Sequence, residues 1–209
     1  MSDLTETVPS NVDLVFTPAA RQAQAARGSD KLYEKRIAKG FPDTITPELE
    51  AYVAERDTAF LATVSAAGAQ YIQHRGGPKG FIKVINDRTL GFADYAGNKQ
   101  YITISNLAGN DRAYLFLLDF AHRQRIKLWG RARVVENDAA LCAKLADLGY
   151  RAKPERAILF TIQAWDVNCS QHITERFTTE EVAGAVSGLR ERLAHLEAEN
   201  AQLRSALGR

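Results

Sequence analysis

Apolar residues recur at every second position through much of the middle of the chain, a pattern typical of strands with one buried face. Turn signals such as Ala66-Ala67-Gly68 and Asn86-Asp87-Arg88 separate these segments. Turns at such intervals are typical of closed antiparallel sheets, in which closure removes the exposed edges. We therefore expect a mainly β, α+β fold built around an antiparallel β-barrel. The predicted strands are residues 60–65, 69–74, 81–85, 89–93, 112–119, 125–135 and 157–165.

Helix signals are few and lie between or outside the predicted strands. Thr17-Pro18 and Thr46-Pro47 each place proline at the first helical position, where its missing N–H is not needed. Gly97-Asn98 and Asp138 are further candidate caps, and residues 1–12 are expected to be flexible. Because strands and helices do not alternate regularly, a doubly wound parallel fold is disfavoured. The predicted peripheral helices are residues 19–26, a short helix opening at 46–48, 99–107 and 139–148.

The C-terminal segment differs from the rest of the chain. Thr178 and Glu181 form a capping box, and apolar residues then repeat about every 3.5 residues, as in a left-handed coiled coil. Asn200 falls within the seam, where a buried asparagine selects a parallel, in-register dimer. The alternative is an amphipathic helix packed on its own barrel. The seam positions are Val186, Leu189, Leu193, Leu196, Asn200, Leu203 and Leu207.

These patterns divide the chain into three parts. Residues 1–45 form an N-terminal extension with a helix, residues 46–177 the barrel, and residues 178–209 the coiled-coil helix. The net charge of +2, without a basic run, argues against a nucleic-acid-binding protein. No stretch approaches the roughly 18 apolar residues that span a bilayer, and the polar N-terminus is unlike a signal peptide. We therefore expect a soluble cytoplasmic protein that binds neither nucleic acid nor membrane.

Metal and thiol chemistry find little support in the sequence. The four histidines are scattered without recognisable metal-ligand spacing, so we expect no metal site. The two cysteines suggest no disulfide framework. Cys169 lies near His172 but has no identifiable orienting partner, and Cys142 fits a small core residue.

Three clusters of residues suggest a site for an anionic ligand. Residues 72–84 place glycine-rich backbone beside basic side chains, which favours phosphate binding, although an ordinary hairpin loop is the alternative. Residues 94–100 lead from a strand into a predicted helix, and Lys99 in its first turn would oppose the helix dipole unless an anion is bound. A solvated lysine is the alternative. Strand alternation puts Arg125, Lys127, Trp129 and Arg131 on one face, which suits either solvent or an anionic aromatic ligand.

The order of these clusters resembles the split-barrel FMN-binding family of pyridoxamine 5′-phosphate oxidase, in particular its oxidase-related branch. The matching stretches are Gln-His-Arg-Gly-Gly-Pro-Lys-Gly-Phe-Ile-Lys-Val at 73–84, Asp-Tyr-Ala-Gly-Asn-Lys-Gln at 94–100 and Arg-Ile-Lys-Leu-Trp-Gly-Arg-Ala at 125–132. Residues 164–173 also resemble that branch. The resemblance covers about residues 45–177. It implies a split barrel and a homodimer that holds two FMN molecules between its subunits.

The resemblance also implies roles for individual residues. Arg75, Lys83 and Lys99 would hold the FMN phosphate, with Lys99 in the place of the family's phosphate-binding arginine. Arg125 takes the place of a glutamine near the flavin ring, and Trp165 resembles a tryptophan from the partner subunit. Gln73 and His74 would also border the ring and the substrate pocket. The candidate FMN-binding residues are Gln73, His74, Arg75, Phe81, Ile82, Lys83, Val84, Asp94, Tyr95, Asn98, Lys99, Gln100, Arg125, Lys127 and Trp165.

The chain also departs from the oxidase pattern. Lys99-Gln100 stands where the oxidase has an Arg-Lys pair, and the C-terminal Arg-x-His-Asp-Arg type element that grips pyridoxal phosphate is absent. The resemblance therefore implies an FMN-dependent oxidoreductase that transfers hydride to or from an unknown small molecule. The alternatives are a non-catalytic flavin or haem carrier or sensor that signals through the coiled coil, and a deazaflavin-dependent reductase on the same barrel.

Overall fold

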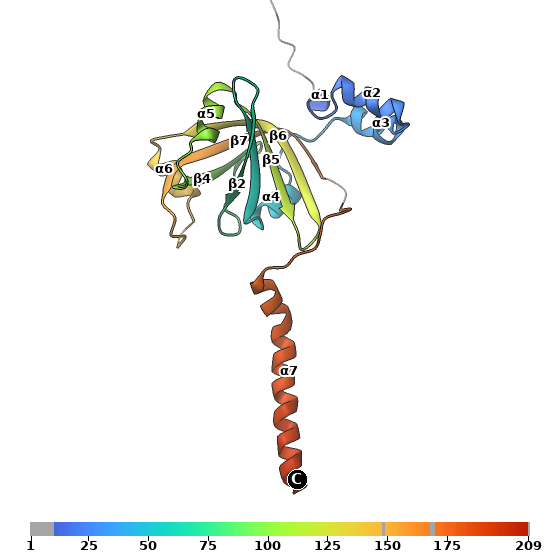
Figure 1. Ribbon diagram of the computed structural model, residues 1–209, viewed down its shortest axis with the longest axis vertical. Coiled ribbons are helices and arrows are strands. Elements are labelled where there is room, and N and C mark those ends of the chain that lie inside the picture. Colours follow the sequence, from blue (N-terminus) through green and yellow to red (C-terminus); the bar gives the residue numbers. More distant parts are fainter. Residues whose placement is uncertain (1–10, 148, 168–169, 209) are drawn as a thin grey trace, which may run out of the picture. The chain divides into compact units, whose positions relative to one another are not determined.

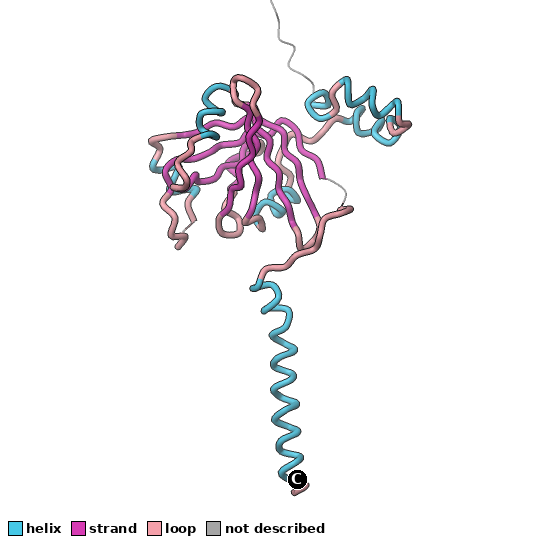
Figure 2. The backbone as a smooth tube through the Cα atoms, viewed as in Figure 1, coloured by secondary structure: helices cyan, strands magenta, loops and turns pink. Residues whose placement is uncertain are grey.

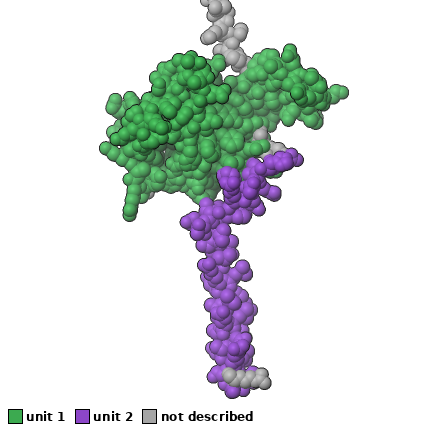
Figure 3. Space-filling model, viewed as in Figure 1, with its two compact units in different colours: residues 1–119, 124–170 green, residues 120–123, 171–209 purple. Residues whose placement is uncertain are grey.

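The computed structural model describes residues 11–147, 149–167 and 170–208. These residues fall into two compact units, coloured separately in Figure 3. The first combines the described parts of residues 1–119 and 124–170, and the second combines residues 120–123 with the tail from residue 171. The first unit holds the sheet, and it contains all of the candidate FMN-binding residues.

The sheet has seven antiparallel strands in the order β2-β1-β5-β6-β7-β4-β3 (Figure 1). Every pairing between neighbouring strands is antiparallel. The strands match the predicted segments to within a few residues, and the predicted antiparallel split-barrel fold is confirmed. The strands are β1 Thr58–Val64, β2 Gln70–Gly76, β3 Lys83–Asn86, β4 Thr89–Tyr95, β5 Arg112–Asp119, β6 Gln124–Val135 and β7 Pro154–Val167.

One face of the sheet forms the main hydrophobic core. Residues alternate between buried and partly exposed along β1, as the sequence pattern predicts. In β4 and β7, by contrast, runs of consecutive residues are buried, so these strands are covered on both faces. Phe92 and Phe160 are the largest fully buried side chains, and Phe81 packs edge-on against Phe92 with the ring centroids 6.1 Å apart. Burial of these rings stabilises the strand order around them.

The helices of the first unit lie outside the strands, as Figure 2 shows. The predicted caps Thr17, Thr46 and Asp138 each accept a hydrogen bond from the backbone N–H three residues on. Residues 29–45 contain a helix that the sequence analysis missed. The short first helix includes residues 11 and 12, which were predicted to be flexible, while residues 1–10 lie outside the described chain. These helices are α1 Asn11–Val15, α2 Pro18–Ala26, α3 Asp30–Lys39, α4 Pro47–Ala54, α5 Ile102–Gly109 and α6 Ala139–Leu145.

The prediction for the start of α5 was wrong. The helix begins at Ile102 rather than at Lys99, because Lys99 and Tyr101 adopt left-handed backbone angles with φ near +56° and +55°. Such residues end or precede a helix and cannot lie in its first turn. Lys99 therefore stands in the connecting loop, and the argument that its charge opposes the dipole of this helix does not hold.

The second unit contains the long helix α7, Thr179–Ala206. Its predicted capping box is confirmed, since Thr178 Oγ1 accepts from the Glu181 N–H and the Glu181 carboxylate accepts from the Thr178 N–H at 2.8 Å. Within the described part of the chain, no helix combines the length and the apolar character needed to cross a membrane.

Gly130 marks an irregularity in the pairing of β6 with β7. The register shifts between Trp129 and Gly130, and a Cβ atom at Gly130 would lie 2.1 Å from the Thr161 carbonyl oxygen and 2.9 Å from the Phe160 ring. The first contact is with backbone and the second with a fully buried ring, so neither neighbour moves easily. The close approach of the two strands therefore requires glycine.

We predict that Gly130→Ala lowers the free energy of unfolding of the barrel by about 2–3 kcal/mol, because the added methyl group overpacks the contact between β6 and β7. Urea unfolding followed by tryptophan fluorescence measures this, since both tryptophans lie on these two strands. Gly184→Ala is the control, because Gly184 lies on α7 with no atom within 4 Å of its added Cβ. Equal midpoints for the two variants would contradict the prediction.

Candidate functional site

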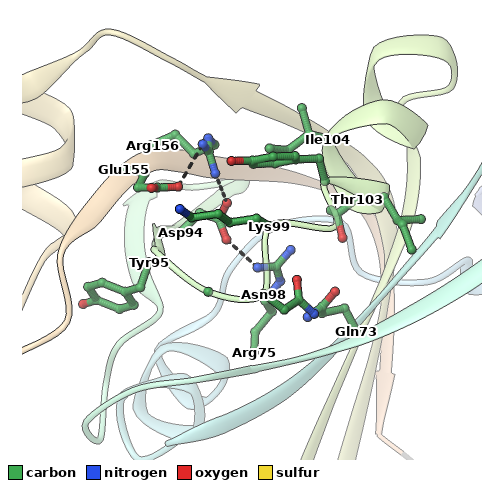
Figure 4. A pocket seen from close by; sticks show the side chains of 13 residues that line it. Gln73, Arg75, Asp94, Tyr95, Asn98, Lys99, Thr103, Ile104, Glu155 and Arg156 are labelled. Carbon is green, nitrogen blue, oxygen red and sulfur yellow. Dashed lines mark hydrogen bonds and ion pairs between the residues drawn. The ribbon is translucent and has the colours of Figure 1, made fainter.

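A small polar pocket of about 70 Å³ lies where β4 runs into the loop before α5 (Figure 4). Its walls come from β2, the end of β4, the loop at 97–101, the start of α5 and the start of β7. Six of the candidate FMN-binding residues line it, and they come from two of the three clusters, residues 72–84 and 94–100. The lining residues are Gln73, Arg75, Asp94, Tyr95, Gly97, Asn98, Lys99, Tyr101, Ile102, Thr103, Ile104, Glu155 and Arg156.

An ion cluster centred on Asp94 forms the floor of this pocket. Asp94 and Arg156 are direct cross-strand partners on β4 and β7, and Arg156 Nη1 donates to Asp94 Oδ2 at 3.0 Å. Arg75 Nη1 donates to the other oxygen, Asp94 Oδ1. Asp94 is therefore gripped from both sides, as the dashed lines in Figure 4 show. We call Arg75, Asp94 and Arg156 the arginine clasp.

The arginine clasp joins parts of the sheet that no backbone pairing joins. β2 stands at one edge of the sheet, and β4 is next to the strand at the other edge. Arg75 on β2 reaches Asp94 on β4 across the gap that separates these edges. All three side chains are between 8% and 16% exposed, so the ion pairs are only slightly screened by water. The arginine clasp thus closes this end of the barrel with side chains.

The pocket carries one more positive than negative charge. Arg75, Arg156 and Lys99 face two carboxylates, Asp94 and Glu155, and Glu155 lies 3.0 Å from Arg156 Nη2. Burial by itself lowers the pKa of Arg156, but the hydrogen bond and charge of Asp94, together with Glu155, outweigh burial and raise that pKa. The guanidinium therefore stays charged, and the pocket attracts an anion.

Four buried side-chain atoms of pocket-lining residues lack a hydrogen-bond partner among the described residues: Arg75 Nε, Tyr95 Oη, Thr103 Oγ1 and Arg156 Nε, the last of which lies 3.5 Å from the Glu136 carboxylate. Thr103 Oγ1, on the first turn of α5, is buried and makes no hydrogen bond. Arg75 Nε is buried and unpartnered as well, although its Nη1 is bound to Asp94. Buried polar groups without partners are costly, and they are common where a ligand is missing. A hydroxyl and a guanidinium N–H are both donors that suit phosphate oxygens.

The loop at 97–101 holds Lys99 over the pocket. The Asn98 side-chain oxygen accepts from the Gln100 backbone N–H at 3.1 Å, which forms a local turn. Lys99 is exposed and has no ion-pair partner within the described chain. The Tyr101 ring lies under the Arg156 guanidinium, 5.7 Å away. This exposed loop is therefore tethered to the buried arginine clasp through Tyr101.

The other candidates from the glycine-rich segment lie outside this pocket. Phe81 and Ile82 are 2% exposed in the hydrophobic core, and Val84 packs against it, so their side chains do not face a ligand. Lys83 on β3 pairs with Asp147 at 2.5 Å. His74 points to the opposite face of β2 from Arg75, where its ring meets Phe60 with centroids 5.7 Å apart.

The remaining candidates also lie elsewhere. Gln100 borders the pocket loop but does not line the pocket. Arg125 and Lys127 project from β6 onto the face of the sheet that bears Phe116, and burial lowers the pKa of Lys127. Trp165 packs against the core, and its Nε1 donates to the Thr44 carbonyl at 2.9 Å. Lys83 and Arg125 therefore do not join Arg75 and Lys99 within a single subunit.

Arg156, Glu155 and Thr103 are among the pocket residues that the sequence analysis missed. The predicted last strand began at residue 157, whereas β7 begins at Pro154, so Arg156 was left outside it. The charge pattern Glu155-Arg156 before a buried run was visible in the sequence, but its strand register opposite Asp94 was not. Within the described residues, no group of three or more histidine, cysteine or acidic side chains could hold a metal ion.

Comparison with known proteins gives one strong match. The family model described as pyridoxamine 5′-phosphate oxidase matches residues 45–169, which is more than half of the chain. No curated protein matches. Among solved structures, HupZ from Group A Streptococcus is 17% identical, covering 64% of this chain and 99% of that one, with a TM-score of 0.49. An FMN-binding protein from Syntrophomonas wolfei is 13% identical, covering 71% and 97%, with a TM-score of 0.46.

We predict that Asp94→Asn lowers the free energy of unfolding by roughly 3 kcal/mol, because it leaves the buried Arg75 guanidinium without a counter-charge and Arg156 with only Glu155 and Glu136. Urea unfolding measures the loss. Asp43→Asn is the matched control, since it breaks an exposed pair with Arg88 whose side chain is 50% exposed, and it should cost less than about 1 kcal/mol. A loss for Asp94→Asn as small as that for the control would show that the arginine clasp does not hold the barrel.

Proposed function

This chain belongs to the pyridoxamine 5′-phosphate oxidase family, and on that premise we propose that it is an FMN-dependent oxidoreductase. The observation that carries the proposal is the pocket whose wall contains the arginine clasp. It combines an excess of positive charge with two buried polar atoms, Thr103 Oγ1 and Arg75 Nε, that have no hydrogen-bond partner in the described part of the chain. Both features fit the phosphate end of a flavin nucleotide.

The volume of the pocket limits which part of FMN can bind inside it. About 70 Å³ accommodates a phosphate group but not a three-ring flavin, so the ring would extend outside the pocket. Lys99 would close over the phosphate from the loop, and the Thr103 hydroxyl would donate from below. Asp94 would not contact the phosphate, because both of its oxygens are already bound by arginines.

We propose that a second copy of the chain completes the site. The outer face of β1, β2 and β5 carries apolar side chains in contact with water, including Phe60, Phe116 and Ile72, which is 67% exposed. An apolar surface of this kind favours association, and covering it would shield a flavin ring from water. Arg125 and Lys127 flank this face, which supports their assignment to the edge of a shared site. We also propose that the protein acts in the cytoplasm.

The flavin ring, when bound, supplies the hydride chemistry. The protein would hold the phosphate through Arg75, Lys99 and Thr103, and it would orient the rest of the nucleotide by fixing that end. The side chain of Gln73 lines the same pocket and accepts a hydrogen bond from Tyr71, so its amide is held in one orientation. The substrate is proposed to be a small molecule that reaches the exposed ring.

We predict that Lys99→Ala weakens FMN binding by about tenfold or more, because a charge-assisted contact with phosphate contributes roughly 1.5–3 kcal/mol. Fluorescence titration of the purified protein with FMN gives the dissociation constant. Lys144→Ala, at the exposed end of α6, removes an equal charge away from the pocket and should leave affinity unchanged. An unchanged dissociation constant in Lys99→Ala would show that this pocket does not bind the FMN phosphate.

The absorbance spectrum and mass of the copurifying ligand separate the rival functions. We expect a yellow protein that releases FMN and whose flavin is bleached by NADH or NADPH without oxygen. A bound FMN that neither nucleotide nor a chemical donor reduces would support a carrier or sensor. Haem absorbance would identify haem as the cofactor in place of FMN, and a released deazaflavin would identify a deazaflavin. A colourless protein that does not bind added FMN would overturn the proposal.

A further inference from the structure

Helix α7 presents a row of large apolar side chains to solvent. None of its residues is buried, and the leucines of the seam are between 44% and 72% exposed. Together with Asn200 they follow one another at alternating intervals of three and four residues, which places them along one stripe of the helix. A stripe of this kind is stable in water only when a partner covers it. The five leucines are Leu189, Leu193, Leu196, Leu203 and Leu207.

The residues of the stripe specify the kind of partner. Leucine occupies the d positions 189, 196 and 203, and Val186 and Asn200 are among the a positions. Leucine at d favours two strands, and an asparagine at a pairs best with an identical asparagine. Asn200 meets its counterpart only when two copies run parallel and in register. In an antiparallel pair with the a and d layers matched, Asn200 would face Leu189, leaving its amide buried without a partner.

The charges beside the stripe favour the same arrangement. In a parallel pair, each g residue lies next to the e residue five positions later on the partner helix. Arg192 at g would meet Glu197 of the other copy, and Glu199 at g would meet Arg204. Both contacts join opposite charges, and two-fold symmetry repeats each of them on the other side. A shift by one heptad would break the match of the asparagines.

The intrinsic helix propensity of α7 is low in its first half. Gly184 and Gly188 lie on the outer surface of the helix, away from the stripe, and have no neighbouring atom within 4 Å. Each glycine costs about 1 kcal/mol relative to alanine. The helix therefore depends on packing along the stripe for its stability, because nothing on its outer surface compensates for the glycines.

We propose that α7 pairs with α7 of a second copy as a parallel, in-register, two-stranded coiled coil, with Asn200 opposite Asn200. Three features support a second α7 as the partner and the parallel, in-register alignment. They are the apolar spacing, the seam asparagine and the two complementary charge contacts. The pairing does not depend on the bound cofactor, so it can be tested independently of the proposed function.

Disulfide cross-linking of the full chain tests the orientation. In a background with Cys142 and Cys169 replaced by serine, Leu196→Cys places a thiol at a d position, which faces itself only in a parallel, in-register pair. Mild oxidation should convert most of this variant into a disulfide-linked dimer, while Ser205→Cys on the outer surface stays monomeric on a denaturing gel. Absence of a cross-link at 196, as expected for a helix packed on its own barrel or for an antiparallel pair, would overturn the proposal.

Charge reversal gives a second test that does not rely on a single thiol position. One chain carries Arg192→Glu with Arg204→Glu, and the other carries Glu197→Arg with Glu199→Arg, both in the Leu196→Cys background. Each variant alone places like charges at every g–e contact, whereas the mixed pair restores opposite charges at all of them. After mixing, mixed dimers should exceed the share expected from random pairing. A random distribution would show that these charges do not specify the partner.

Discussion

The arginine clasp is the interaction on which the barrel and its pocket both depend. The order of the sheet puts β2 and β4 near opposite edges, so no backbone hydrogen bonds hold these edges together in the described chain. Arg75 reaches Asp94 across this gap, and Arg156 reaches it along the sheet. Removing three charges from water is costly, and only mutual pairing offsets that cost. The barrel is therefore closed at this end by a small, buried set of charges.

The same set of charges explains why the pocket proposed to bind an anion contains a carboxylate. Without Asp94, two buried guanidinium groups would repel each other whenever the pocket is empty. With Asp94 bound to both, the two arginines stay in place in the wall of the pocket. The cost is a weaker attraction for the ligand, since one positive charge is neutralised. Lys99 restores positive charge from an exposed loop, where it can move toward a ligand without strain on the core.

The sequence predicts the strands well and the pocket only in part, for a physical reason. Alternation between buried and exposed residues is a local property, so β5 was predicted to the residue. The start of α5 depends on left-handed backbone at Lys99 and Tyr101, which costs L-residues roughly 1–2 kcal/mol each and which no local pattern in the sequence signals. The sequence did not predict Arg156 as a pocket residue, because its place opposite Asp94 is set by strand register. The pairing of Lys83 with Asp147 was not predicted either, because the two residues lie far apart in the sequence.

The coiled coil proposed for α7 would add a second way to join the same two chains. The connection between β7 and α7, residues 168–178, spans at most roughly 36–40 Å when extended. Two chains joined through α7 would hold their barrels at a high effective concentration, so a modest apolar face on each barrel would suffice for association. In the proposed in-register pairing of Asn200, the two connections would also begin at the same level of the coiled coil. A symmetric pair of tails therefore favours a symmetric pair of barrels, and both copies of a shared flavin site would form together.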